Sequence, residues 1–230
     1  MEQSITVYGG KIMDFSVFSA FDHSVFQWIQ EHIWCEFLNV LMPIITFLGE
    51  GGCFWIVLAV VCLFSKKYRK VGVTMAFALI VMILVNDLTL KNIFARVRPF
   101  NFEPFADLYA GFPVSADGKP ELLVSLPSSY SFPSGHTSSS FAAATAILLN
   151  KKWKVGVPAF VLAILIGFSR NYLMVHYPTD VLFGALMGMV YAVIAYFLIA
   201  KFVYPLFDKY VGQKVDAFFA KKFGKKEKAN

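Results

Sequence analysis

The sequence predicts an all-α fold: one domain over residues 1–230 that forms a polytopic membrane bundle of about six transmembrane helices. Hydrophobic residues make up 57% of the chain and aromatic residues 17%, and the mean hydropathy is +0.60. These values exceed the usual balance of a soluble domain. Charged residues make up only 16% and fall in short clusters between apolar segments. Such a pattern indicates a chain that crosses a bilayer several times.

The net charge of +6 does not indicate nucleic-acid binding, because the basic residues flank apolar segments and do not share one polar face. Cys35, Cys53 and Cys62 are odd in number and lie in or beside apolar segments, so we expect no disulfide framework and interpret them as buried small residues. Residues 1–14 lack the pattern of a cleaved secretory signal. We therefore expect insertion through an uncleaved span.

The predicted elements begin with an interfacial helix. Val25, Trp28, Ile29 and Ile33 recur at helical spacing among polar neighbours, which favours a helix lying at the membrane surface. Apolar segments of about 20 residues then predict spans, and shorter uncharged segments are accepted as well. The expected spans are 37–48, 51–65, 71–90, 137–150, 155–172 and 179–204.

Six spans place both termini on one side, and the basic residues indicate which side that is. Of the 21 Lys and Arg residues, 16 fall on the side of the termini, including the basic tail from about 205–230. Because basic loops stay in the cytoplasm, we expect both termini to be cytoplasmic and the connections 91–134 and 171–178 to face outward. The five outward basic residues are Lys91, Arg96, Arg98, Lys119 and Arg170.

The first unusual segment of the outer face is LKNIFARVRPF. Lys91 and Arg98 are seven residues apart, which on a helix places them on nearly the same face. Pro99 predicts that this helix ends at Arg98. Asp87, four residues before Lys91, is placed to pair with its ammonium group. Taken alone, the segment is also compatible with two cations reaching toward the interface.

The second segment is SFPSGHTSS. Pro133 ends the preceding chain, Ser134 is a suitable N-cap and Gly135 lets an anion approach the backbone. The N-terminus of the helix that follows favours phosphate through its free N–H groups and its dipole. His136 projects from the first turn. The alternative is an ordinary capped helix with a histidine at the water boundary.

The third segment is FSRNYLMVHYPTD. Ser169 and Arg170 end one span, and Pro178 is expected in the first turn of the next. Asp180 then lies in that turn, within reach of His176. A carboxylate that holds one ring nitrogen leaves the other free to attack as a nucleophile. The alternative is an interfacial histidine and a carboxylate that stabilises the helix dipole.

On the last span, Asp180, Gly184 and Gly188 recur at four-residue steps on one helix face. The GxxxG pattern predicts close packing against another span, which would fix Asp180 in place. A homodimer interface is the alternative interpretation.

The three segments bring cations, an anion-binding helix start and two histidines to one membrane face. Together they resemble the complete three-part signature of the type 2 phosphatidic acid phosphatase (PAP2) superfamily, in its order and spacing across residues 91–180. The resemblance implies that His176 attacks phosphorus to form a phosphohistidine, supported by Asp180. It also implies that His136 is the general acid and then the base. The implied phosphate-binding residues are Lys91, Arg98, Ser134, Gly135 and Arg170.

The resemblance implies a lipid phosphatase of the cell membrane whose site opens at the outer leaflet. The expected substrates are undecaprenyl diphosphate, phosphatidic acid and phosphatidylglycerol phosphate. We expect no cofactor and no metal, because three fixed cations can replace a divalent ion and His23 and His32 lie far from the signature. Two alternatives remain: a vanadate-dependent haloperoxidase-like enzyme, and a noncatalytic lipid-binding or transport protein.

Overall fold

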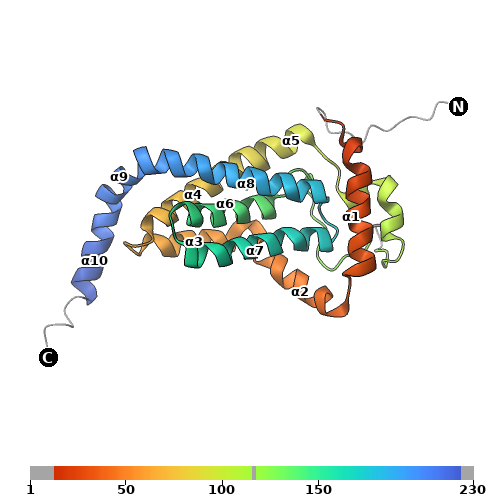
Figure 1. Ribbon diagram of the computed structural model, residues 1–230, viewed down its shortest axis with the longest axis horizontal. Helices are drawn as coiled ribbons and strands as arrows, with labels where there is room; N and C mark the ends of the chain where they lie inside the picture. Colours follow the sequence, from red (N-terminus) through yellow and green to blue (C-terminus); the bar gives the residue numbers. More distant parts are fainter. Residues whose placement is uncertain (1–12, 116–117, 224–230) are drawn as a thin grey trace.

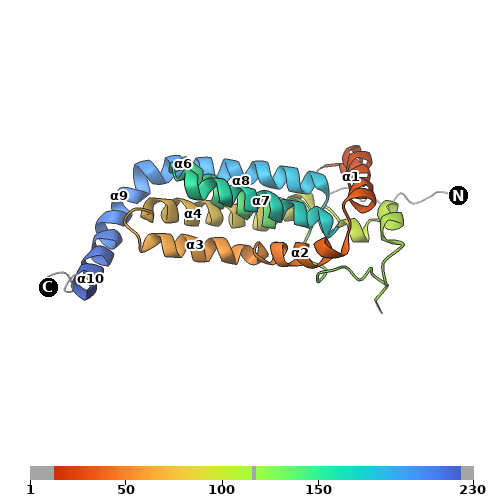
Figure 2. The same ribbon diagram turned by 60° about the horizontal axis from the view of Figure 1, so that its bottom comes forward.

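The computed structural model describes residues 13–115 and 118–223. Within these ranges the regular structure is helical, with one isolated bridge between Val114 and Pro120 and no strand. The expected all-α fold is confirmed. The long helices run side by side as a bundle (Figures 1 and 2). They are α2 (Glu36–Phe47), α3 (Cys53–Leu63), α4 (Arg69–Met82), α6 (Gly135–Leu149), α7 (Trp153–Tyr172) and α8 (Pro178–Leu198).

Helix α6 is the central element of the bundle. It packs against α4, α7 and α8, and its serine and alanine side chains are almost all buried. Small residues allow this close approach on both sides. A Cβ added to Gly184 would lie 2.8 Å from the carbonyl oxygen of Ser134, and one added to Gly188 would lie 3.0 Å from the nitrogen of Ala142. The GxxxG pattern of α8 therefore packs within the chain, as predicted, and is not available for the alternative homodimer interface.

The helices differ in how well they can cross a membrane. Among the described residues, three are long and apolar enough by length and composition: Arg69–Asn101, Trp153–Tyr172 and Pro178–Leu198. Glu36–Phe47 and Glu50–Leu63 are long and apolar enough to cross a membrane only when taken together, as a pair bent by 40°. The two segments predicted as separate spans at 37–48 and 51–65 thus join into one broken span or a re-entrant loop.

The first and last described helices lie at opposite ends of the bundle. Helix α1 (Ser19–His32) crosses one end, whereas α10 (Gln213–Phe223) extends from the other (Figure 1). Six spans would have returned them to the same end. The difference arises because α2 and α3 follow one another along the bundle and together traverse it once. The predicted N-terminal helix is confirmed, and Trp28 on it is exposed.

The helix that carries Lys91 ends earlier than the sequence predicts. Helix α4 continues through a π-helical segment (Ile83–Leu90) into the short α5 (Lys91–Phe94). Ala95 then adopts a left-handed conformation with φ of 47°, which stops the helix. The expectation that Arg98 lies on the same helix face as Lys91 was wrong. The chain leaves the helix here because Arg96 turns inward to buried carboxylates.

The connection after α5 closes one end of the bundle with aromatic side chains. It contains two 3₁₀ segments, Pro99–Asn101 and Glu103–Tyr109. The ring of Phe105 lies 6.2 Å from that of Phe26 on α1 and 5.4 Å from that of Tyr177. These contacts tie α1 to the loop that precedes α8.

The C-terminal part is a helical extension that is anchored to the bundle. It runs through α9 (Tyr204–Phe207), a π-helical segment (Asp208–Gly212) and α10. Arg69, 1% exposed at its side chain, pairs with Asp208 at 3.2 Å and Asp216 at 2.6 Å. The predicted basic tail is therefore attached to the start of α4 in its described part, and residues 224–230 lie outside the described residues.

The three cysteines are free, as expected. Their predicted burial was wrong for Cys35 and Cys53, which are exposed on the outside of the bundle, and Cys62 is partly buried. The physical reason is that in a membrane bundle an apolar side chain can face lipid as well as the core.

Candidate active site

A cavity of about 920 Å³ lies among α2, α4, the start of α6 and the loop before α8. It brings together six of the eight residues that the sequence predicted for the site. The cavity-lining residues among them are Lys91, Arg98, Gly135, His136, Arg170 and His176. Ser134 and Asp180 do not line it; both are fully buried behind its wall.

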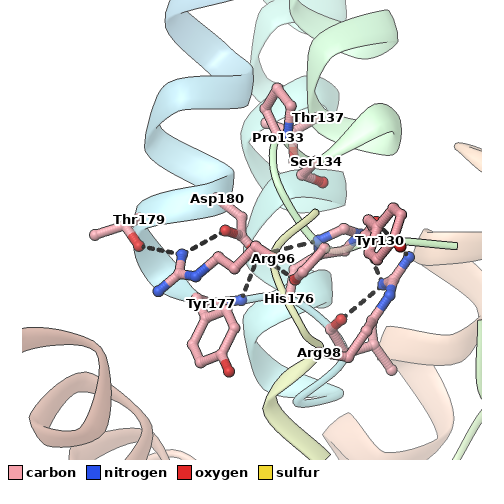
Figure 3. Close-up of polar contacts among 12 residues, drawn as sticks. Arg96, Arg98, Tyr130, Pro133, Ser134, Thr137, His176, Tyr177, Thr179 and Asp180 are labelled. Atoms are coloured by element: carbon pink, nitrogen blue, oxygen red, sulfur yellow. Dashed lines mark hydrogen bonds and ion pairs between the residues drawn. The ribbon is translucent and has the colours of Figure 1, made fainter. Parts of the chain in front are cut away.

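His176 lies in the loop between α7 and α8 and is 2% exposed. Its Nδ1 lies 3.4 Å from Asp180 Oδ2, and its Nε2 lies 3.1 Å from Arg98 Nη1 (Figure 3). A guanidinium group only donates hydrogen bonds, so Nε2 must accept and Nδ1 must carry the proton. His176 thus has the tautomer with an Nε2 lone pair, which a nucleophile requires, and this lone pair faces Arg98 at the cavity wall.

Asp180 is held at the start of α8 by the local sequence. Pro178 occupies the first turn, as predicted, and the Asp180 carboxylate accepts a hydrogen bond from the Tyr177 nitrogen at 3.1 Å. The Ser131 hydroxyl donates to the same oxygen, Oδ2. Arg96 Nη1 donates to the other oxygen, Oδ1, at 2.5 Å. The predicted position of Asp180 is confirmed, whereas its pairing with Arg96 was not predicted.

The start of α6 is the helix end that the sequence predicted to bind an anion. Ser134 is the N-cap residue with extended backbone angles, but its hydroxyl accepts a hydrogen bond from Thr137 Oγ1 at 2.9 Å and does not cap a backbone N–H. The predicted N-cap position of Ser134 is confirmed, and its side chain bonds to Thr137 instead of to a backbone N–H. A Cβ added to Gly135 would lie 3.1 Å from Asp87 Oδ1 and 3.4 Å from Lys91 Nζ. Only a residue without a side chain lets the helix start come this close to Lys91.

His136 follows in the first turn of α6. Its Nε2 lies 3.2 Å from Oε2 of Glu50, which sits in the bend between α2 and α3. Gly51 and Gly52 beside Glu50 have φ of 55° and 67°, a conformation that glycine adopts without strain. The glycine-rich bend thus brings an acidic side chain to His136, a contact that the sequence interpretation missed.

Three cations approach the cavity from different elements. Lys91 Nζ pairs with Asp87 Oδ1 at 2.7 Å, as predicted. Arg170 Nη1 donates to Thr46 Oγ1 at 2.7 Å, while its buried Nε has no hydrogen-bond partner among the described residues. A buried donor without a partner favours an anion beside it.

Arg98, the third cation, is fixed by the chain around it. It donates to the carbonyl oxygens of Ser129 and Val175, each at 2.8 Å. Its position therefore depends on the loop 124–129 and on the residue before His176, and not on a shared helix with Lys91.

The charges of the site act on both histidines. Burial, followed by Arg98, Arg170, Lys91 and His136, lowers the pKa of His176 well below 6.5. Burial and the same three cations lower the pKa of His136 to about 3. Both imidazoles are therefore neutral at pH 7. A bound phosphate would offset the cations and let His136 take up a proton.

Comparison with known proteins identifies the family. The model of the PAP2 superfamily matches residues 67–204. The chain belongs to the PAP2 superfamily. It is 32% identical over 152 residues to an undecaprenyl-diphosphatase of Sulfolobus acidocaldarius, an alignment that covers 66% of each chain.

Two Bacillus subtilis proteins extend this comparison of the PAP2 chain. Undecaprenyl-diphosphatase BcrC is 27% identical over 172 residues, 74% of this chain and 80% of that protein. The crystal structure of a transmembrane PAP2-type phosphatidylglycerolphosphate phosphatase superposes with a TM-score of 0.60 at 27% identity, covering 81% of this chain and 88% of that one. The membrane branch of the PAP2 superfamily, expected from the sequence, is the branch that these proteins represent.

Proposed function

We propose that this PAP2 chain hydrolyses the terminal phosphate of a membrane lipid phosphate or diphosphate through a phosphohistidine on His176. The observation that carries the proposal is the shared cavity: His176, His136 and three cations line one space, and the Nε2 atom of His176 lies beside Arg98, one of these cations. The names of the relatives support the same reaction class.

In the first step, His176 Nε2 forms a bond to phosphorus while the bond from phosphorus to the lipid oxygen breaks. His136 donates its proton to that oxygen, and Asp180 supports the Nδ1 proton of His176. In the second step, His136 takes a proton from water and the water oxygen attacks phosphorus. The P–N bond then breaks, which releases inorganic phosphate and returns His176 to its neutral form.

The non-bridging oxygens need positive partners throughout both steps. Lys91, Arg98 and Arg170 approach the cavity from three different elements, and Gly135 opens the start of α6 to the anion. Fixed donors of this kind stabilise the charge that develops in the transition state. The free Nε of Arg170 is such a donor.

A lipid substrate fits the cavity better than a soluble ester. One wall is apolar and comes from α2 and from the end of α4 and the segment after it: Pro43, Phe47, Met82 and Ile83. Phe47 is also 74% exposed on the outside of the bundle, where lipid chains would lie. A lipid tail can therefore leave the cavity sideways while its head group stays among the cations. Undecaprenyl diphosphate is the first candidate substrate, followed by phosphatidylglycerol phosphate and phosphatidic acid.

The cavity faces the outside of the cell membrane in this proposal. The basic residues before α4 and before α7 lie at the end of the bundle away from the cavity, and basic segments stay in the cytoplasm. The C-terminal extension shares that cytoplasmic end. Because α1 lies at the cavity end, only the C-terminal part keeps the cytoplasmic placement first expected for both termini.

The test is phosphate release by the purified full-length chain in detergent micelles. Undecaprenyl diphosphate, phosphatidylglycerol phosphate and phosphatidic acid are supplied separately. We expect release from at least one of them and a loss of at least about 10³-fold in His176→Ala. The control is His32→Ala, because the contacts given for His32 in the described part of the chain are with Trp28, one turn earlier in its own helix. Equal release by wild type and His176→Ala would contradict the proposal.

The two alternatives give different outcomes in the same preparation. Bromide oxidation with vanadate and peroxide, without phosphate release, would support a haloperoxidase-like enzyme. Lipid transfer between vesicles that survives in His176→Ala would support a transport protein.

A further inference from the structure

A chain of buried charges extends from α1 to the catalytic loop. Arg96 Nη2 lies 2.7 Å from Asp22 Oδ2, and Arg96 Nη1 lies 2.5 Å from Asp180 Oδ1. The side chains of the two aspartates are 0% exposed and that of Arg96 is 5% exposed. Buried charges without partners are costly, so each member of this chain depends on the others.

Asp22 also binds the start of α8 directly. Its Oδ1 accepts a hydrogen bond from the Thr179 nitrogen at 2.9 Å, and its Oδ2 accepts one from Thr179 Oγ1 at 2.8 Å. The first N–H groups of a helix have no partner within the helix. Helix α1 therefore supplies a cap for α8 at the residue next to Asp180.

Arg96 is fixed on its remaining sides by aromatic rings. Its guanidinium carbon lies 3.7 Å from the ring centroid of Tyr177 and 4.5 Å from that of Phe15. Figure 3 shows the side chain directed at Thr179 and Asp180, on the opposite side of Asp180 from His176. Neither Arg96 nor Asp22 lines the cavity, so neither can touch a bound phosphate.

We infer that Asp22 and Arg96 are positioning residues for the nucleophile, and that α1 is part of the catalytic apparatus through them. The inference rests on the proposed phosphohistidine mechanism. Arg96 holds Oδ1 of Asp180 and thereby directs Oδ2 at His176 Nδ1. Asp22 shares the charge of Arg96, so the Asp180 carboxylate keeps enough negative charge to support the imidazole when phosphorus is attached to Nε2.

The experiment measures kcat and KM of full-length variants in detergent. Arg96→Met removes the positive charge at similar volume. Arg96→Lys keeps the charge but loses the guanidinium group that bonds to Asp22 and Asp180 at once. Asp22→Asn removes the negative charge and keeps the shape of the side chain. We expect kcat to fall about 100-fold in Arg96→Met and about 10-fold in Asp22→Asn, with KM changed less than about threefold. Arg96→Lys should recover part of the loss. The rate of phosphohistidine formation in a single turnover should fall with kcat.

Coupling between the two residues gives a second readout. If Asp22 acts through Arg96, the double variant Asp22→Asn/Arg96→Met should be no slower than Arg96→Met alone. Two independent structural losses would multiply instead, to about 1000-fold.

Arg69→Met is the matched control. Arg69, 1% exposed at its side chain, also joins two aspartates, Asp208 and Asp216, at the other end of the bundle, although these aspartates are 38% and 37% exposed. It should lower thermal stability as Arg96→Met does and leave the kcat of the folded fraction within about twofold. If Arg96→Met does not yield monodisperse protein, Asp22→Asn and Arg96→Lys decide the question.

Three results would overturn the inference: a folded Arg96 variant with kcat near wild type, a rise in KM alone, or an equal loss of kcat in Arg69→Met. The His176→Ala variant distinguishes a failure of the proposed mechanism from a failure of the positioning role. Full activity in His176→Ala contradicts the proposed mechanism, whereas an inactive His176→Ala beside an active Arg96→Met contradicts only the positioning role.

Discussion

Arg98 Nη1 lies 3.1 Å from His176 Nε2, the atom that would attack phosphorus. This N–H donates to the Nε2 lone pair of His176. A phosphate oxygen is a stronger acceptor because it is charged, and it would draw the same donor to itself. In the proposed mechanism, substrate binding would thus free the lone pair as phosphorus comes into reach.

The state of this lone pair predicts the pH dependence. Burial and the neighbouring cations lower the pKa of His176 well below 6.5. Protonation of Nε2 abolishes nucleophilicity, so activity should fall only as the pH drops through that lowered value. We expect the acid limb of kcat/KM, which reports the free enzyme, to lie clearly below pH 6.5.

The measurement needs two substrates, because phosphate groups titrate in the same range. If the acid limb of the kcat/KM profile lies at the same pH with undecaprenyl diphosphate and with phosphatidic acid, it belongs to the enzyme. A common limb centred at or above pH 6.5 would contradict the prediction.

Gly49 controls the position of His136. A Cβ added to Gly49 would lie 2.9 Å from His136 Cδ2 and 2.8 Å from Ile166 Cγ2. Gly49→Ala should therefore push the imidazole away from the leaving oxygen and lower kcat by about 10- to 100-fold. Phosphate release with undecaprenyl diphosphate checks this.

The control for Gly49→Ala is Gly111→Ala, because nothing lies within 4 Å of a Cβ at Gly111. The control should keep wild-type kcat. Equal kcat in the two variants would show that Gly49 has no role in placing His136.

Local sequence signals predicted the parts of the site that are close along the chain. Pro178 set the start of α8 and so the place of Asp180, and the four-residue step from Asp87 to Lys91 gave their ion pair. These relations depend on helix geometry alone, which a pattern of residues encodes.

Contacts across the fold were not predictable in the same way. Arg96 pairs with Asp22, which is 74 residues away, and His136 meets Glu50, which is 86 residues away. The left-handed Ala95 has no sequence signal such as a glycine, so the end of α5 was placed four residues too late. Lys91 and Arg98 both line the cavity, as the sequence predicted, but no single helix carries both of them.

Chelation tests the expected metal independence. In the proposed mechanism, Lys91, Arg98 and Arg170 supply the positive charge that a divalent ion would otherwise provide, so treatment with EDTA followed by its removal should leave kcat within about twofold. Phosphate release before and after treatment is the measurement. A persistent loss that only a divalent ion restores would contradict the prediction.

Gly188 tests the packing of α8 on α6. A Cβ there would lie 3.0 Å from both the Ala142 nitrogen and the Phe141 Cβ, and closer still to the Ser138 carbonyl oxygen. Backbone atoms of a central helix cannot move aside as a flexible side chain can, so Gly188→Ala should lower the free energy of unfolding by about 1–3 kcal/mol. Thermal unfolding in detergent measures the loss.

At Gly167 the nearest added-Cβ contacts are side-chain atoms at 3.3 Å, so Gly167→Ala is the milder control. If Gly167→Ala destabilises the protein as much as Gly188→Ala does, close backbone packing of α8 on α6 is not what fixes Asp180.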